Sequence, residues 1–140
     1  MSLDALRAST EGTFQAWVNA NAPGTPIRFQ NVPFVRPSDA PFFTFHILDM
    51  KTWTANLGSQ KIDRHIGTIF IDYAVPPNTG TSAANQMISS AGFIWRYARF
   101  LLPDGSSVKF HAPDIHQTGD LNGMFVVSLR MIYTRDEKMQ

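Results

Sequence analysis

The apolar residues at the start of the chain recur at close to helical spacing. They are Leu3, Leu6, Phe14, Trp17 and Val18, with Thr10 filling the gap in the stripe. Ser2 can cap a helix that begins here, and the run at 19–24, which contains Pro23 and Gly24, ends it. The pattern therefore predicts a first helix that ends near Val18.

Alternating apolar and polar residues predict strands further along the chain. The expected strands are residues 42–48, 65–75 and 124–133, with a shorter one at 108–111. Residues 32–40, which follow a short apolar segment at 27–29, contain Pro33 and Pro37 and are followed by Pro41. Because proline cannot donate a hydrogen bond to a neighbouring strand, we interpret this stretch as an edge or a loop.

The segments between these strands predict loops. Residues 50–64 are too many for a tight turn, and loops of that length are usually functional or disordered. Residues 112–123 predict a second loop, and the charged tail after Arg135 is expected to fray.

A second helix is predicted from Thr81 or Ser82 to about Leu102. Its apolar stripe follows the helical period and comprises Ala84, Met87, Ile88, Ala91, Ile94, Trp95, Ala98, Leu101 and Leu102. The element order and the half-polar strands predict an α+β fold: a mostly antiparallel sheet of about four to five strands, with two main helices packed on one face. The length of the chain predicts a single domain over residues 1–140.

An aromatic stripe is expected on the outer side of this second helix. Phe93, Tyr97 and Phe100 recur at positions i, i+4 and i+7, opposite the core stripe. An apolar outer stripe is normally covered by another surface. The cover is either the first helix, through Phe14 and Trp17, or a neighbouring subunit.

Composition narrows the classes of function. With 44% hydrophobic and 16% charged residues the chain is globular, and its net charge of +1 argues against a dedicated nucleic-acid binder. That balance still allows a passive lining around DNA. The absence of cysteine excludes disulfides, thiolate metal sites and a cysteine nucleophile. We find neither a signal peptide nor a run long enough to cross a bilayer, so no membrane partner is expected.

No set of residues predicts catalysis. His111, Asp114 and His116 lie within six residues, but their spacing matches no metal-ligand pattern and Pro113 divides them. His65 follows Asp63 without a nucleophile to activate, and residues 77–82 lack the glycines and lysine of a phosphate-binding loop. We therefore expect no catalytic residue, no cofactor and no metal, and we expect the protein not to be an enzyme.

Short motifs along the chain resemble those of the phage tail-terminator-like, or tail completion, proteins. The resemblance runs through residues 2–7 to Trp17, 31–34, 64–67, 69–73, 77–80 and 123–127, and ends near Tyr133. It covers nearly the whole chain, in order and with similar spacing. Members of this family form a ring, typically six-fold, on the head-proximal end of the tail, which stops tube growth and provides the surface that joins the head.

The resemblance implies a virion protein of the tail and neck, assembled in the host cytoplasm. Its partners would be further copies of itself, the major tail tube protein and head–tail connector or neck proteins, with at most non-specific contact to DNA in the lumen. Candidate residues for subunit contacts are Trp53, Leu57, Phe93, Tyr97 and Phe100, and candidate basic residues facing the lumen are Lys51, Lys61 and Arg64. The alternatives are another neck, head-completion or tail-tube component, or a small-ligand-binding α+β domain with an aromatic pocket.

Overall fold

The computed structural model describes residues 2–30, 32–37, 39–57, 60–77, 80–103, 105–121 and 123–138. At residues 2, 3, 51, 53, 55–57, 60, 120, 121 and 138 it describes the backbone only. The elements in chain order are α1 (Ser2–Asn21), β1 (Ile27–Phe29), β2 (Phe42–Leu57), β3 (Gln60–Val75), α2 (Ser82–Ala91), β4 (Arg99–Leu101), β5 (Ser107–Leu121) and β6 (Met124–Lys138).

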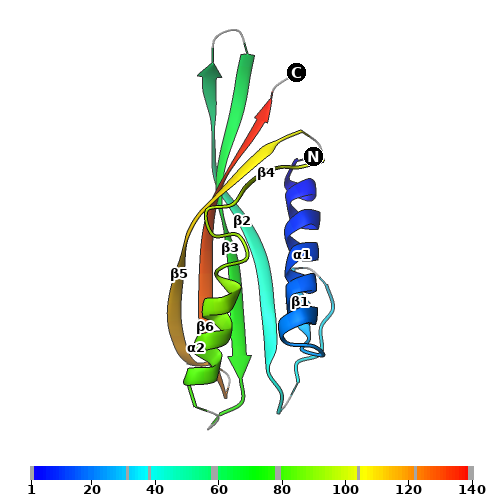
Figure 1. The fold of residues 1–140 in the computed structure, drawn as a ribbon, viewed down its shortest axis with the longest axis vertical. Helices are drawn as coiled ribbons and strands as arrows, with labels where there is room; N and C mark the ends of the chain where they lie inside the picture. The colour runs from blue at the N-terminus through cyan, green and yellow to red at the C-terminus, as the bar shows by residue number, and fades with distance from the viewer. Residues whose placement is uncertain are drawn as a thin grey trace.

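The strands form one six-stranded mixed sheet in the order β1-β2-β3-β6-β5-β4 (Figure 1). β1 pairs with β2 in parallel, and the four other pairings are antiparallel. The prediction of a mostly antiparallel sheet with four to five strands is therefore wrong, although the fold is α+β. Both additional strands, β1 and β4, have only three residues, and segments that short carry no readable alternation.

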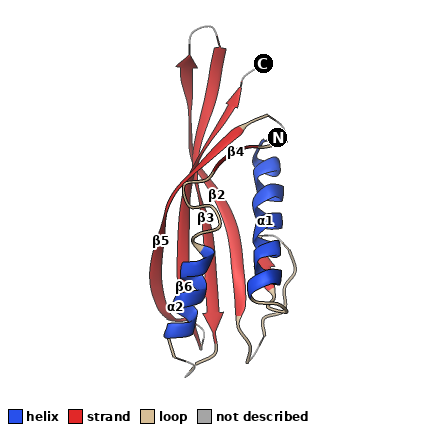
Figure 2. Cartoon of the chain, in the orientation of Figure 1, coloured by secondary structure: helices blue, strands red, loops and turns tan. Residues whose placement is uncertain are grey.

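Both helices lie on one face of the sheet (Figure 2). Alternate residues of the central strands point toward them and form the core, which includes Phe43 and Phe45 of β2, Ile69 and Ile71 of β3, and Leu129 of β6. The opposite face carries no helix in the described part of the chain and is more polar. We call it the open face.

α1 forms as its apolar stripe predicts. Leu6, Thr10, Phe14 and Val18 follow one another at four-residue intervals and are all fully buried. The hydroxyl of Thr10 donates to the carbonyl of Leu6 at 2.8 Å, which satisfies its hydrogen-bonding capacity inside the core. The ring of Phe14 packs on those of Phe43 and Phe45, each with centroids 5.3 Å apart.

The predicted loop at residues 50–64 is wrong, because residues 50–57 and 60–64 belong to the paired strands β2 and β3 of a long hairpin, and residues 58 and 59 lie outside the described part of the chain. Pairing continues from Phe42↔Ala74 to Leu57↔Gln60, with one irregularity between Asp49 and Lys51. The distal part of this hairpin projects beyond α1 and beyond the end of β6 (Figure 1). With no core beneath it, the tip needs no apolar face, so its sequence lacks the alternation of a half-buried strand.

The second helix is also shorter than predicted, because α2 ends at Ala91. Gly92 caps it, and the chain then passes through turns into β4. The predicted stripe residues after Ala91 lie outside the helix: Trp95 and Leu102 are buried in the core, and Leu101 is exposed in β4. Likewise, the predicted loop at 112–123 is wrong, since β5 continues to Leu121. The expected fraying directly after Arg135 is also wrong, since β6 stays paired to Lys138.

Candidate assembly site

Two large aromatic side chains stand out from the surface between α2 and β4. Phe93 is 67% exposed and Tyr97 is 65% exposed. The guanidinium carbon of Arg96 lies 5.5 Å from the Phe93 ring centroid and 5.4 Å from that of Tyr97, so the cation is held between the two rings. We call residues 92–98 the aromatic turn.

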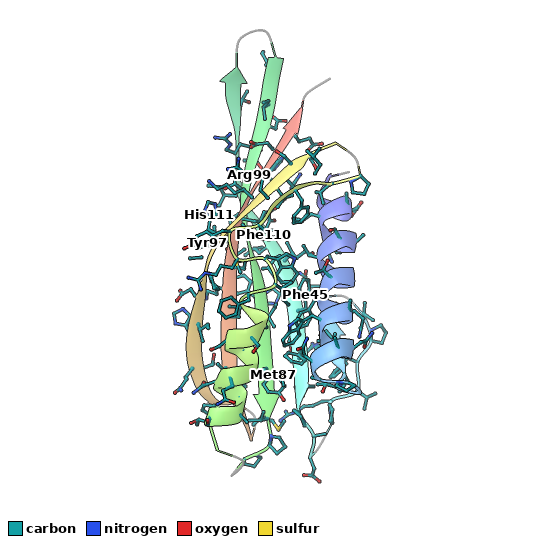
Figure 3. The ribbon with its side chains drawn as sticks, in the orientation of Figure 1. Phe45, Met87, Tyr97, Arg99, Phe110 and His111 are labelled. Atoms are coloured by element: carbon teal, nitrogen blue, oxygen red, sulfur yellow. The ribbon has the colours of Figure 1, made fainter. Side chains whose placement is uncertain are left out.

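Trp95 fixes the aromatic turn to the sheet. It is 2% exposed, and its ring stacks on Phe110 with centroids 5.7 Å apart and lies 6.3 Å from Phe45. Phe110 and Phe45 lie beneath the turn in Figure 3. Trp95 is buried, while its neighbours two residues away in each direction, Phe93 and Tyr97, are exposed.

Tyr97 adopts a left-handed backbone conformation with φ of 55°. Among the described residues it is the one non-glycine residue with a positive φ. This conformation brings Cβ close to the carbonyl oxygen and costs about 1 kcal/mol or more for a residue of this type. A hydrogen bond of 2.8 Å from the Ala98 amide to the Trp95 carbonyl closes the turn around it.

Phe100 does not belong to this exposed group. It lies in β4, half-buried, with its ring centroid 5.7 Å from that of Phe110. The predicted stripe of Phe93, Tyr97 and Phe100 on one helix is therefore wrong, because the helix ends before all three residues. The predicted cover from α1 is also absent: Phe14 and Trp17 pack on β2 instead.

The hairpin carries the other predicted contact residues. Trp53 and Leu57 lie on β2, where Trp53 is the register partner of Arg64 and Leu57 that of Gln60. Their side chains lie outside the described part of the structure, as does that of Lys51. The structure therefore places these three residues on the hairpin but does not bring their side chains into a described site.

The two other predicted basic residues differ in their environment. Lys61 is exposed near the tip of the hairpin. Arg64 makes a bidentate ion pair with Asp136 of β6, at 2.8 and 3.0 Å. The hydrogen bond to that carboxylate raises the pKa of Arg64 further. Arg64 is thus partly neutralised on the open face.

A buried polar cluster at the base of the hairpin gave no signal in the sequence. Arg135, 2% exposed, donates to a carboxylate oxygen of Asp49 at 2.6 Å, and the Tyr133 hydroxyl donates to the other oxygen. Burial and the neighbouring carboxylate raise the pKa of Tyr133 far above its ordinary value. Gly67 lies between Asp49 and Tyr133 in the sheet register and leaves the space that the tyrosine ring crosses.

The histidines considered as metal ligands do not converge. His111 bonds to the hydroxyl of Thr134 at 3.2 Å, whereas His116 pairs with Asp114 at 2.8 Å on the surface. Among the residues that the structure describes, no three histidine, aspartate or glutamate side chains are placed to share a metal ion. The prediction that the protein has no metal site remains a prediction.

Two long strand edges lie on opposite sides of the sheet. On β2, pairing with β1 stops at Phe45, and the Gln30 side chain accepts the Ile47 amide at 2.9 Å. On β5, pairing with β4 stops at Lys109, and the Phe110 amide bonds to the Ala98 carbonyl. Beyond these points, within the described residues, the outer edges of both strands pair with no other strand.

Comparison with known proteins supports the fold alone. No family model matches the chain, and no curated protein matches its sequence. A solved structure, whose name states no function, is similar over 100% of this chain and 99% of its own, with a TM-score of 0.78 and 18% sequence identity. No helix in the described ranges is long and apolar enough to span a membrane.

Proposed function

We propose that this chain is a structural subunit of a phage tail, which closes into a six-membered ring at the head-proximal end of the tube. In that position the ring stops tube growth and offers the surface that joins the head. Its partners are further copies of the chain, the major tail tube protein and the connector or neck proteins. The proposal combines the sequence resemblance to tail-terminator-like proteins with the geometry of the surface.

The aromatic turn is the observation that carries the proposal. Packing against their own chain stabilises Phe93 and Tyr97 little, since about two thirds of each residue is exposed. Tyr97 is also held in a strained backbone conformation. Tyrosine and arginine dominate the energetics of protein interfaces, particularly when presented on a rigid support such as Trp95 provides. Exposed aromatic groups of this kind favour contact with another protein chain.

The open strand edges provide the two different surfaces that a ring requires. A ring forms when one surface of each subunit binds a different surface of the next and the rotation between them closes. The edge of β2 beyond Asp49 and the edge of β5 beyond residue 111 differ in sequence and lie on opposite sides of the sheet. A contact between them is therefore heterologous, and unpaired strand edges readily accept another strand.

The projecting hairpin supports contact along the tail axis. Its distal part extends beyond the helices, so it can reach a protein above or below the ring without disturbing the core (Figure 1). We assign it to the tube or to the neck.

A pair of surface variants tests the aromatic turn. In phage carrying F93S/Y97S, we expect tails of irregular length or tails not joined to heads, viewed by electron microscopy. The control is I132S, which removes a 48% exposed apolar side chain from the open face of the central strand β6, away from both edges. Tails made with F93S/Y97S that match those made with the parent and the control would contradict the proposal.

A second candidate, another neck, head-completion or tail-tube component, draws on the same exposed surfaces. Localisation of the chain within the particle distinguishes it from a terminator. The alternative of a small-ligand-binding domain with an aromatic pocket has less support. The aromatic rings of the core pack on one another, as Phe43 does on Tyr73 with centroids 4.5 Å apart.

A further inference from the structure

A concave region on the open face gathers basic side chains from three strands. It has a volume of about 420 Å³ and is lined by Arg64, Arg99, Ser107, Val108, Lys109, His111, Thr134 and Asp136. Two of these side chains, Arg99 of β4 and His111 of β5, lie near each other in Figure 3. We call this region the basic pocket.

Two cations in the basic pocket oppose each other directly. Arg99 and Lys109 are register partners in the antiparallel pair of β4 and β5, so their side chains leave the same face of the sheet side by side. Both are exposed, and among the described residues neither forms an ion pair with a carboxylate. Like charges directly opposite each other destabilise a sheet unless an anion lies between them.

The carboxylate in the basic pocket is already engaged. Asp136 accepts both of its hydrogen bonds from Arg64, at 2.8 and 3.0 Å. Three permanent cations therefore face one carboxylate, which leaves an excess of two positive charges when His111 is neutral. Ser107 and Thr134 add hydroxyl groups to the lining, and Thr134 is held by His111 at 3.2 Å.

We propose that the basic pocket binds phosphate groups. A phosphate group carries up to two negative charges at neutral pH, and successive phosphodiesters of a nucleic acid carry one each, so either neutralises the excess. One carboxylate of a protein partner would neutralise half of it. Guanidinium groups also present paired N–H donors that match phosphate oxygens. The site lies on the opposite face of the sheet from the aromatic turn, and the inference stands without the proposed function.

The test compares two double variants that lose equal charge. R99Q/K109Q removes the opposed pair, and R28Q/R130Q removes two exposed arginines that lie on the open face outside the basic pocket. Titrations of the full chain, followed by calorimetry and by NMR, use pyrophosphate, a short DNA duplex and a polyglutamate peptide. Each is repeated at low and at physiological salt, because exposed charges are screened.

We expect the parent and R28Q/R130Q to bind pyrophosphate, and R99Q/K109Q to bind it about tenfold more weakly or worse, since charge-assisted hydrogen bonds are lost. Binding of the duplex with the same dependence on Arg99 and Lys109 identifies a nucleic-acid backbone as a source of the phosphate. Binding of pyrophosphate without the duplex identifies a smaller phosphate compound. In either case the phosphate site stands.

Three results would overturn the inference. The first is that neither pyrophosphate nor the duplex binds the parent. The second is an equal loss of binding in both double variants, which would show a diffuse field and no site. The third is tighter binding of polyglutamate than of both phosphate probes, which would assign the pocket to a carboxylate partner. Unfolding by urea checks the variants, and R99Q/K109Q should be no less stable than the parent because a repulsion is removed.

Discussion

At the scale of single residues, two arginine–aspartate pairs link strands of the sheet, one between the neighbours β3 and β6 and one from β6 across β3 to β2. The side chains of Arg135 and Asp49 are 2% and 21% exposed, whereas those of Arg64 and Asp136 are 37% and 27% exposed, so the two pairs differ mainly in the burial of the arginine. Removing one partner of a buried pair leaves the other as an uncompensated charge, while an exposed pair contributes little. The two pairs therefore form a matched comparison.

We predict that R135M lowers the free energy of unfolding by about 2 kcal/mol, because the hydrogen bond of the buried guanidinium to the partly buried carboxylate of Asp49 is lost. R64M should lower it by about 0.5 kcal/mol, since water can solvate Asp136. Urea denaturation of both variants measures the difference. Equal losses would show that the burial of Arg135 does not govern its contribution.

The raised pKa of Tyr133 predicts a loss of stability in alkali. Below its ordinary value of 10.0 the tyrosine is protonated in both states; above it, the unfolded chain loses the proton and the folded chain keeps it. Stability therefore falls above about pH 10, by up to about 1.4 kcal/mol per pH unit for each such group. Burial raises the pKa of Tyr73 in the same direction, so Tyr73 adds to this loss.

The variant Y133F removes the contribution of Tyr133 to this pH dependence and leaves that of Tyr73. It lowers stability at every pH because Asp49 loses a donor, but the decline between about pH 9 and about pH 11 should be shallower than in the parent. The slope of the unfolding free energy against pH is the quantity to compare. An unchanged slope would mean that Tyr133 ionises equally in the folded and unfolded chain.

Two glycines should respond to alanine in opposite directions. A Cβ at Gly67 would collide with the Tyr133 hydroxyl and the Leu48 carbonyl, so G67A should cost about 2 kcal/mol. Gly12 lies in α1 with nothing within 4 Å of such a Cβ, so G12A should stabilise by about 0.5–1 kcal/mol. Thermal unfolding of both variants checks the signs, and stabilisation by G67A would contradict the packing around Tyr133.

At the scale of elements, the aromatic turn predicts a separation of stability from assembly. Y97G removes an exposed side chain and the strain of a left-handed tyrosine, so the isolated chain should be unchanged or more stable by up to about 1 kcal/mol. Under the proposed function, assembly into tails should nevertheless weaken, because the proposed interface loses one aromatic ring. A variant that is less stable yet assembles normally would assign Tyr97 to the fold and not to an interface.

The elements that sequence could predict are those whose full length lies on the core. α1 packs over several turns, and its buried positions repeat regularly, so the pattern of Leu6 to Val18 was readable. The β2–β3 hairpin leaves the core after Asp49, and its tip lacks the apolar alternation that marks a half-buried strand. α2 was predicted too long because Trp95 and Leu102, buried by separate contacts, fit a helical period by coincidence.

The candidate contact residues were predicted from a geometry that the molecule does not have. Phe93 and Tyr97 are exposed because a turn holds them outward on either side of Trp95, whereas Phe100 faces the core from β4. The pairing of Arg135 with Asp49 links residues 86 positions apart, and no local pattern in the sequence could indicate it.

At the scale of the whole molecule, the sheet has one covered face and one open face. The helices, the core and the aromatic turn lie on the covered side, while the basic pocket lies on the open side. The two free strand edges separate these sides, and a ring that closes through the edges would turn the faces in opposite directions, one inward and one outward. The aromatic turn and the basic pocket therefore lie on different faces of the sheet.

Electron microscopy of particles produced without this protein tests the terminator role most directly. A ring that ends the tube must match its symmetry and stop its growth, so in its absence we expect tails of irregular length, or tails that fail to join filled heads. Restoring the chain should restore a uniform tail length, with six copies at the top of each tube. Normal tails attached to normal heads in the absence of the protein would contradict the account.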